Sequence, residues 1–262
     1  MGTKMKNAPI YFAIVQVRFN ALLQINEHVP KVQDALRRLG FPDYSRAISA
    51  VIRPGAANEM PAIEQQVRHE FMDANRGSGF TLDHRAVSFQ TTDYDTLEPF
   101  LSHLVNVLGI IDEAVGGLAF SERVGMRTLD VVRPQPTEPM GKYLKSSVLG
   151  LIDSLPDREL VQTFCETVTK AATTTLISRI STSHQNSGPV PYPPDLAQIS
   201  LKLPERFATL SGMYSILDTD CWHDGREDYS IDNIKSKVHS LHDEMDKSFR
   251  ATVTQHALNT WK

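Results

Sequence analysis

Arg123-Val-Gly-Met-Arg127-Thr-Leu-Asp130-Val-Val132, near the middle of the chain, is the stretch on which the predicted architecture depends. Its residues alternate as they would in a β-strand with one packed face and one arginine-bearing face. The packed face carries Val124, Met126 and Thr128, and the other carries Arg123, Gly125 and Arg127. Pro134 and Pro136 end the strand, because proline lacks the N–H group that a sheet requires. We therefore predict a strand that lies between two halves of the chain and joins them.

The residues before this stretch predict strands and two helices. A strand over 10–19 is apolar on both faces and should lie centrally in a sheet. Apolar residues at helical spacing predict one helix over 25–39, with Asn26 as its N-cap, and another over 97–111. Further strands are expected over 46–52, 65–72 and 81–90, the last with a bend at Asp83-His84 and the first followed by a turn at Pro54-Gly55.

The proline-rich segment 134–139 is the best candidate for a linker. It gives an N-terminal half over 1–133 and a C-terminal half over 140–262, although one continuous domain also fits. The second half should contain helical material over 140–168, strands over 172–183, 198–203 and 213–221, and an exposed proline-dense loop over 186–194. A long helix, capped by Ser230 or Asp232, should then run to Trp261. The predicted fold is α+β, with mostly antiparallel strands and helices on one face of each half.

The composition indicates an ordinary globular protein, with 41% hydrophobic and 22% charged residues in 262. A net charge of −4 argues against nucleic-acid binding, which needs a basic surface, although a local basic patch is compatible with it. Cys165 and Cys221 are too few for a disulfide framework and match no zinc motif. No apolar run reaches the ~20 residues of a membrane span, and the N-terminus lacks a signal-peptide pattern. A cytoplasmic location without membrane association is expected.

Four potential metal ligands lie close together near residue 220. Asp218 and Asp220 would share one face of a strand, and His223 and Asp224 could fold back from a following turn. Carboxylate oxygens suit hard cations such as Mg or Mn. The reading that we favour has no metal, with the carboxylates on a solvent face or capping the turn.

The two arginines of the central stretch are candidates for binding a carboxylate or a phosphate. Guanidinium donors match those groups in a bidentate manner. The interpretation that we favour pairs Arg127 within the protein, with Asp130 or with one of the aspartates at 218 and 220, because a buried unpaired arginine is costly. Such a pair would tie the two halves together.

Other motifs for chemistry are weak. His242 follows His239 by three residues on the final helix, but the pair lacks the glutamate of a zincin, so a polar helix flank is the better interpretation. Cys165 has neither a base nor an oxyanion donor beside it in sequence. The chain contains no P-loop, no Gly-x-Gly-x-x-Gly and no Gly-x-Ser-x-Gly motif, which lowers the expectation of nucleotide-dependent or hydrolase chemistry.

Several short motifs give the chain a resemblance to a family. They are Pro9-Ile10 leading into Val15-Gln-Val-Arg18-Phe19, then Arg123-Val-Gly-Met-Arg127, Leu217-Asp218-Thr-Asp220, and Leu241-His242 followed by Phe249, Val253-Thr254 and Trp261. Together they resemble a sporadically distributed, uncharacterised family of bacterial proteins of about this length. Thr128 and Asp130 depart from it, since an aromatic residue and an asparagine are usual there. The resemblance implies a soluble bacterial protein with a mobile gene distribution and no established activity or cofactor.

These observations favour a non-enzymatic interaction or accessory protein, for example in a bacterial defence or toxin–antitoxin-like system. Its partner would bind the long final helix, and self-association through that helix or a sheet edge is the simplest variant. The alternative is a metal-dependent enzyme in which Asp218, Asp220 and His223 bind the metal and Arg127 holds an anionic substrate. A second alternative is an RNA-binding protein with a helix-backed sheet, which would need exposed aromatic residues and a basic surface.

Overall fold

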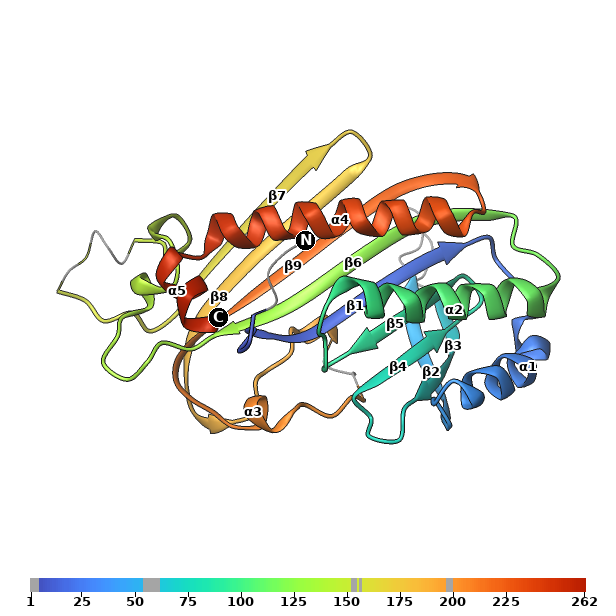
Figure 1. Ribbon diagram of the computed structural model, residues 1–262, viewed down its shortest axis with the longest axis horizontal. Helices are drawn as coiled ribbons and strands as arrows, with labels where there is room; N and C mark the ends of the chain where they lie inside the picture. The colour runs from blue at the N-terminus through green and yellow to red at the C-terminus, as the bar shows by residue number, and fades with distance from the viewer. Residues whose placement is uncertain (1–4, 54–61, 152–154, 156, 197–199) are drawn as a thin grey trace.

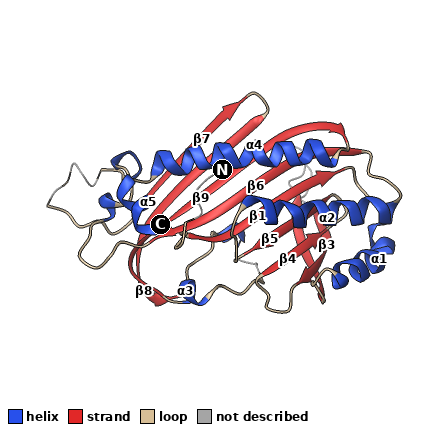
Figure 2. Cartoon of the chain, in the orientation of Figure 1, coloured by secondary structure: helices blue, strands red, loops and turns tan. Residues whose placement is uncertain are grey.

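Nine strands form one antiparallel sheet in the computed structural model, which describes residues 5–53, 62–151, 155, 157–196 and 200–262 (Figure 1). For residues 49–53 and 62–66 only the backbone is described. The strand order across the sheet is β2-β3-β4-β5-β1-β6-β9-β8-β7. The predicted α+β class is confirmed, and Figure 2 shows the helices gathered mainly on one face of the sheet.

The elements follow one another as strands interrupted by single helices. The strands are β1 (Ile10–Phe19), β2 (Asp43–Arg53), β3 (Ala62–Met72), β4 (Ser78–Leu82), β5 (Ala86–Thr91), β6 (Phe120–Val132), β7 (Thr163–Ala171), β8 (Thr174–Gly188) and β9 (Leu210–Asp228). The α-helices are α1 (Ile25–Arg38), α2 (Leu97–Val115), α3 (Glu205–Ala208), α4 (Ile231–Thr252) and α5 (Gln255–Trp261). Short 3₁₀ turns lie at η1 (Met140–Lys142), η2 (Ser146–Val148) and η4 (Pro194–Leu196).

Strand β6, the predicted central strand, joins the earlier and the later strands into one sheet. It pairs with β1 along one edge, where Val15 faces Met126, and with β9 along the other, where Arg127 faces Asp220. Because both edges of β6 are hydrogen-bonded, no boundary between two sheets can lie beside it. The two halves over 1–133 and 140–262 are therefore not separate sheets, and the segment 134–139 is a loop on the rim of a shared one.

Helices α2 and α4 cover one face of the sheet. Their apolar stripes bury Leu104 and Leu108 of α2 and Ile234, Val238 and Leu241 of α4 in the largest apolar cluster, together with side chains of β1 and β6. Burial of such a stripe is what holds an amphipathic helix on a sheet. The apolar face of α4, predicted as a partner surface, is thus used within the protein. None of the helices in the described residues is long and apolar enough to cross a membrane.

The opposite face of the sheet is partly covered by an irregular segment, residues 189–196 and 200–208, which we call the strap. Val190, Leu201 and Phe207 of the strap are buried against Tyr11 and Leu129 of the sheet. The Tyr11 hydroxyl donates a hydrogen bond of 2.8 Å to the carbonyl oxygen of Pro191. The proline-dense segment predicted as an exposed loop is therefore in part a packed layer of the fold.

Four predicted elements differ from the structure. The bent strand expected over 81–90 is in fact two strands, β4 and β5, which pair with each other on either side of a turn. The described residues of 140–168 form 3₁₀ turns and the beginning of β7 rather than a helix, and the β-branched residues from Thr163 onward pair with β8. The long final helix is divided: Val253 makes a β-bridge with Leu144, so α4 ends at Thr252 and α5 starts anew. Of the strand predicted over 198–203, residues 200–203 are not a strand, and residues 198 and 199 lie outside the described residues, as does the predicted Pro54-Gly55 turn.

Two of the predicted helix caps can be compared with the structure. Asn26 lies inside α1 and its side chain hydrogen-bonds His69 at 2.9 Å, so it is not the N-cap. Ser230 is the N-cap of α4, as predicted, and its hydroxyl accepts a hydrogen bond of 3.3 Å from the backbone N–H of Asn233.

We expect the substitution Ser230→Ala to lower the free energy of unfolding by about 1 kcal/mol, because it leaves an N–H group in the first turn of α4 without its acceptor. Urea denaturation of the two proteins measures the difference. Ser230→Thr keeps an acceptor oxygen and should stay within a few tenths of a kcal/mol of the parent. An equal loss in both variants would contradict the capping role of this hydroxyl.

Candidate functional site

Arg127 lies on the face of the sheet that the strap covers. Side chains of β6 alternate, so that Leu129 packs into the strap-side apolar cluster while Met126 packs under the helices. In the neighbouring strand β9, Asp220 is opposite Arg127 and Asp218 is opposite Leu129. The antiparallel register therefore places both carboxylates on the same face as the guanidinium group.

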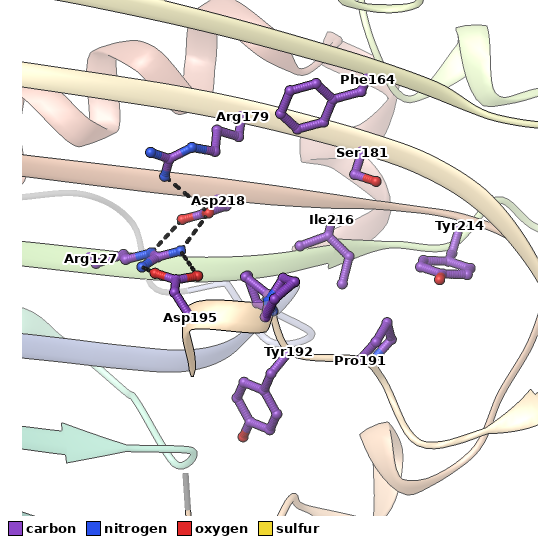
Figure 3. Close-up of a pocket in the computed structure, with 12 residues that line it drawn as sticks. Arg127, Phe164, Arg179, Ser181, Pro191, Tyr192, Asp195, Tyr214, Ile216 and Asp218 are labelled. Carbon is purple, nitrogen blue, oxygen red and sulfur yellow. Dashed lines mark hydrogen bonds and ion pairs between the residues drawn. The ribbon is translucent and has the colours of Figure 1, made fainter. Parts of the chain in front are cut away.

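The guanidinium group of Arg127 is held by two carboxylates (Figure 3). Its Nε and Nη2 donate hydrogen bonds of 2.7 and 2.8 Å to the two oxygens of Asp218, whose side chain is only 6% exposed. Its Nη1 and Nη2 donate bonds of 2.5 and 3.3 Å to Asp195 of the strap, whose side chain is 63% exposed. Arg127 thus has one buried carboxylate partner and one at the surface.

Arg179 of β8 extends this network to the edge of the sheet. It donates a hydrogen bond of 2.7 Å to Glu166 of β7 and one of 3.3 Å to Asp218. We call Arg127, Arg179, Glu166, Asp195 and Asp218 the arginine–carboxylate cluster. Its five members come from five segments, namely β6, β7, β8, β9 and the strap.

The cluster changes the protonation behaviour of its members. Burial would lower the pKa of Arg127, but the hydrogen bonds to Asp218 and Asp195 outweigh it and raise the pKa above the usual range. The hydrogen bond from Arg127 lowers the pKa of Asp195. Burial raises the pKa of the neighbouring Asp220 carboxyl, although Arg127 and Arg123 act against it. The hydrogen bonds between Arg127 and Asp195 thus favour the charged form of both groups.

A pocket of about 470 Å³ opens between the strap and strands β8 and β9. Arg127, Arg179, Asp195 and Asp218 lie at one end of it, as Figure 3 shows. Its remaining walls are mainly aromatic rings, prolines and aliphatic carbon, supplied by Phe164, Ser181, Pro191, Tyr192, Pro193, Pro194, Tyr214 and Ile216. The pocket is thus amphipathic, with a charged end and a largely apolar body.

No known family, curated protein or solved structure matches this chain.

The structure brings together only some of the residues predicted as a site. Arg123 lies further along β6, where its guanidinium group stacks 4.5 Å from the ring centre of Trp222 and lies 3.7 Å from Asp224. His242 lies on α4, in the helix layer on the other side of the sheet, where burial lowers its pKa. Arg127 and Asp218 alone among the predicted residues belong to the arginine–carboxylate cluster, and the favoured internal ion pair of Arg127 is present.

The three residues of the alternative metal site do not converge. His223 lies opposite Val124 on the helix-facing side of the sheet, with its ring 3.0 Å from the Thr173 hydroxyl and 3.6 Å from Glu227. Asp218 and Asp220 lie on the strap side. Within the part of the chain that the structure describes, no group of three or more His, Cys, Asp or Glu side chains is arranged to hold a metal ion. The turn from which His223 and Asp224 were expected to fold back is absent, because both residues belong to strand β9.

Sequence reasoning missed Asp195, Arg179 and Glu166. Arg179 is the one charged residue in an otherwise β-branched and polar strand, and that contrast was an available signal. Asp195 directly follows the proline-dense segment, and the apolar Val190 and Tyr192 within that segment indicate packing against the sheet. No spacing rule connects the three, because the sheet order alone makes them neighbours.

Asp130 is a further acidic residue that the sequence singled out. It faces the helix layer, is only 7% exposed and does not pair with Arg127. Burial raises the pKa of its carboxyl group to about 7. The nearby Tyr94 hydroxyl, whose pKa burial and Asp130 both raise, is buried without a hydrogen-bond partner in the described residues. Asp130 is therefore an internal titrating group outside the pocket.

Proposed function

We propose that this chain is a non-enzymatic interaction protein that associates with a second copy of itself through the free edge of β7. The observation that carries the proposal is the exposure of that edge. Among the described residues β7 hydrogen-bonds only to β8, although it is nine residues long and contains no proline. The N–H and C=O groups along a free edge form a template for another strand.

The exposed apolar side chains of β7 suit a strand that pairs with another chain. Phe164 is 61% exposed and Val168 is 58% exposed, and both point to the strap side of the sheet. The hairpin of β7 and β8 projects beyond α4, so helices leave its outer end uncovered (Figure 1). Natural proteins usually protect such an edge with charge, proline or a covering segment. Here Glu166 and Lys170 are the only charged residues of the strand.

The sequence of β7 is self-complementary about Val168. In an antiparallel pair of β7 strands with its two-fold axis at Val168, Glu166 of each copy lies opposite Lys170 of the other. The pair of strands therefore contains two such contacts. The same register places Thr167 opposite Thr169 and the two Val168 side chains opposite each other. Opposite-charge, threonine and β-branched pairs all stabilise an antiparallel ladder. The β7 strands of two copies are thus sufficient to form a two-fold symmetric dimer, in which the sheet continues from one protomer into its partner.

The geometry favours this function over the two alternatives. A metal-dependent enzyme would need its metal ligands together, but the proposed ligands lie on two faces of the sheet, Asp218 and Asp220 on one and His223 on the other. A sheet that binds RNA presents exposed aromatic rings. Tyr11 and Phe12, on the face opposite the helices, are fully buried beneath the strap.

The cellular setting that we propose follows from the same reading. Both cysteines are free, as in proteins of a reducing compartment, which supports the cytoplasm. The resemblance to a sporadically distributed bacterial family supports an accessory role in a defence or toxin–antitoxin-like system.

Sedimentation velocity of the full chain over a range of concentrations tests the proposal. We expect a monomer–dimer equilibrium, and we expect Val168→Lys to raise its dissociation constant by about tenfold or more, because it places two like charges face to face on the axis. Val161→Lys is the matched control, since Val161 is an exposed valine just before β7. It should leave the equilibrium unchanged. A parent protein that stays monomeric at all concentrations, or equal effects of both substitutions, would refute the β7 interface.

A further inference from the structure

The outer side of Arg127 is occupied by a carboxylate that comes from a short turn at the surface. Asp218 alone satisfies the buried side of the guanidinium group with two hydrogen bonds of 2.7 and 2.8 Å. Asp195 binds the remaining side from a three-residue turn, with 63% of its side chain exposed. Solvent reaches the Asp195 side of this ion pair but little of Arg127, whose side chain is 11% exposed, so water competes with the guanidinium group for the Asp195 carboxylate. Asp195 is therefore easily exchanged for another carboxylate.

Hydrogen bonds anchor the strap to the sheet before and after Asp195, at Pro191 and at Lys202. Before it, the Tyr11 hydroxyl bonds the carbonyl of Pro191. After it, Lys202 donates its backbone N–H to Arg76 at 2.7 Å and accepts a bond of 2.7 Å from the Thr92 hydroxyl. The Asp195 side chain can swing away from Arg127 without release of either anchor. The exchange thus requires a local movement and leaves the apolar packing of the strap intact.

The pocket beside this ion pair has the size and the lining of a small-molecule site. Its volume of about 470 Å³ falls within the range of roughly 300–1,000 Å³ that is usual for such sites. Tyr214, Ile216 and Phe164 offer apolar surface, and Ser181 adds one hydroxyl group. Arg127 and Arg179 lie together at the charged end. A ligand that fills this space must combine an apolar body with an anionic head.

We propose that the pocket binds a small organic monocarboxylate with an aromatic or aliphatic body, whose carboxylate replaces that of Asp195 on Arg127. The apolar body then lies between Tyr214, Ile216 and the prolines of the strap. Arg179, which borders the same end of the pocket, flanks the incoming carboxylate. This site borders the β7 interface at Phe164, but the contact that the ligand replaces lies within one chain.

Charge balance selects a monocarboxylate over a phosphate. The pocket is lined by two arginines and two aspartates, so exchanging the Asp195 carboxylate for one of equal charge keeps the lining neutral. A doubly charged phosphate would add a negative charge a few ångströms from Asp218, which is buried and cannot move into water. A cationic ligand would lie against two guanidinium groups whose carboxylates are already engaged. A planar carboxylate also matches the bidentate donor geometry of arginine.

Titration calorimetry of the full chain with benzoate, 3-phenylpropionate and hexanoate, each compared with its primary amide, tests the site. We expect at least one carboxylate to bind and its amide to bind about tenfold more weakly or not at all, because the amide carries no charge. Asp195→Asn removes the competing carboxylate and should tighten binding by about twofold to fivefold, the range that an exposed ion pair supports. Ser181→Phe fills the pocket and should abolish binding.

The matched control is Asp232→Asn, which removes one exposed carboxylate from the start of α4, away from the pocket. It should leave every affinity unchanged. The proposal is overturned if no carboxylate binds either the parent or the Asp195→Asn protein, or if acid and amide bind equally well. It is also overturned if Asp195→Asn leaves binding unchanged or weakens it. None of these outcomes depends on whether the protein dimerises through β7, because the affinities are measured per chain.

Discussion

Arg127→Met should lower the free energy of unfolding by about 3–5 kcal/mol, the cost of leaving a buried carboxylate without its partner. Asp218 is 6% exposed and receives two hydrogen bonds from Arg127, at 2.7 and 2.8 Å. Without them its remaining partner is the single longer bond of 3.3 Å from Arg179. Urea denaturation at pH 7 measures the loss, which should exceed that of any substitution among the exposed charges of the cluster.

The double substitution Arg127→Met with Asp218→Leu separates the charge effect from lost packing. Removing both charges eliminates the buried unpaired carboxylate, so most of the lost stability should return. The coupling between the two sites in a double-mutant cycle should therefore be large. A double variant as unstable as Arg127→Met alone would show instead that the arginine acts through its packing against the strap.

Arg127 also illustrates how much of this fold its sequence reveals. Strict alternation over 123–132 predicts β6, its arginine-bearing face and an internal partner for Arg127, all of which the structure contains. Strand β1 occupies the predicted residues 10–19 and lies centrally in the sheet. These predictions succeed because alternation and burial on both faces are local properties.

Elements whose conformation depends on distant partners could not be predicted in the same way. Residues 163–171 become a strand because β8 pairs with them, and Val253 ends α4 because its backbone bridges to Leu144. Neither of these long-range contacts can be predicted from the local periodicity of the sequence. The prediction of two separate halves was wrong for the same reason. A proline-rich segment in the sequence does not reveal that the strands before and after it share one sheet.

The candidate site was predicted only where it lies on regular strands. Arg127 and Asp218 were found because arginine and aspartate stand out in alternating strands. Asp195 lies in irregular chain, and its contact with Arg127 spans 68 positions that no periodicity relates. His223 was wrongly grouped with the aspartates, because the strand continues through it and so turns its side chain to the other face of the sheet.

Asp130→Asn should stabilise the protein, and the gain should grow with pH. The carboxyl group of Asp130 is buried beneath the helix layer, and burial raises its pKa from 3.8 to about 7. In the unfolded chain it ionises near pH 4, whereas in the folded protein it stays protonated up to about pH 7. Asparagine has nearly the same shape and carries no charge at any pH.

The sign of the pH dependence follows from proton binding. Between pH 4 and pH 7 the folded protein binds one proton more than the unfolded chain at this position. Its stability therefore falls by about 1.4 kcal/mol per pH unit through that window and levels off above it. The advantage of Asp130→Asn should accordingly be small at pH 4 and reach about 4 kcal/mol at pH 8.

Denaturation of the parent and the variant at pH 4, 5, 6, 7 and 8 measures this difference directly, because every other titrating group is common to both proteins. Asp157→Asn, at an exposed carboxyl group, serves as the control and should show no such trend. A difference that is constant with pH would mean that Asp130 is ionised in the folded protein. The buried carboxyl would then have a compensating partner, and the Tyr94 hydroxyl, whose pKa responds to Asp130 and which lacks a hydrogen-bond partner in the described residues, is a candidate for that role.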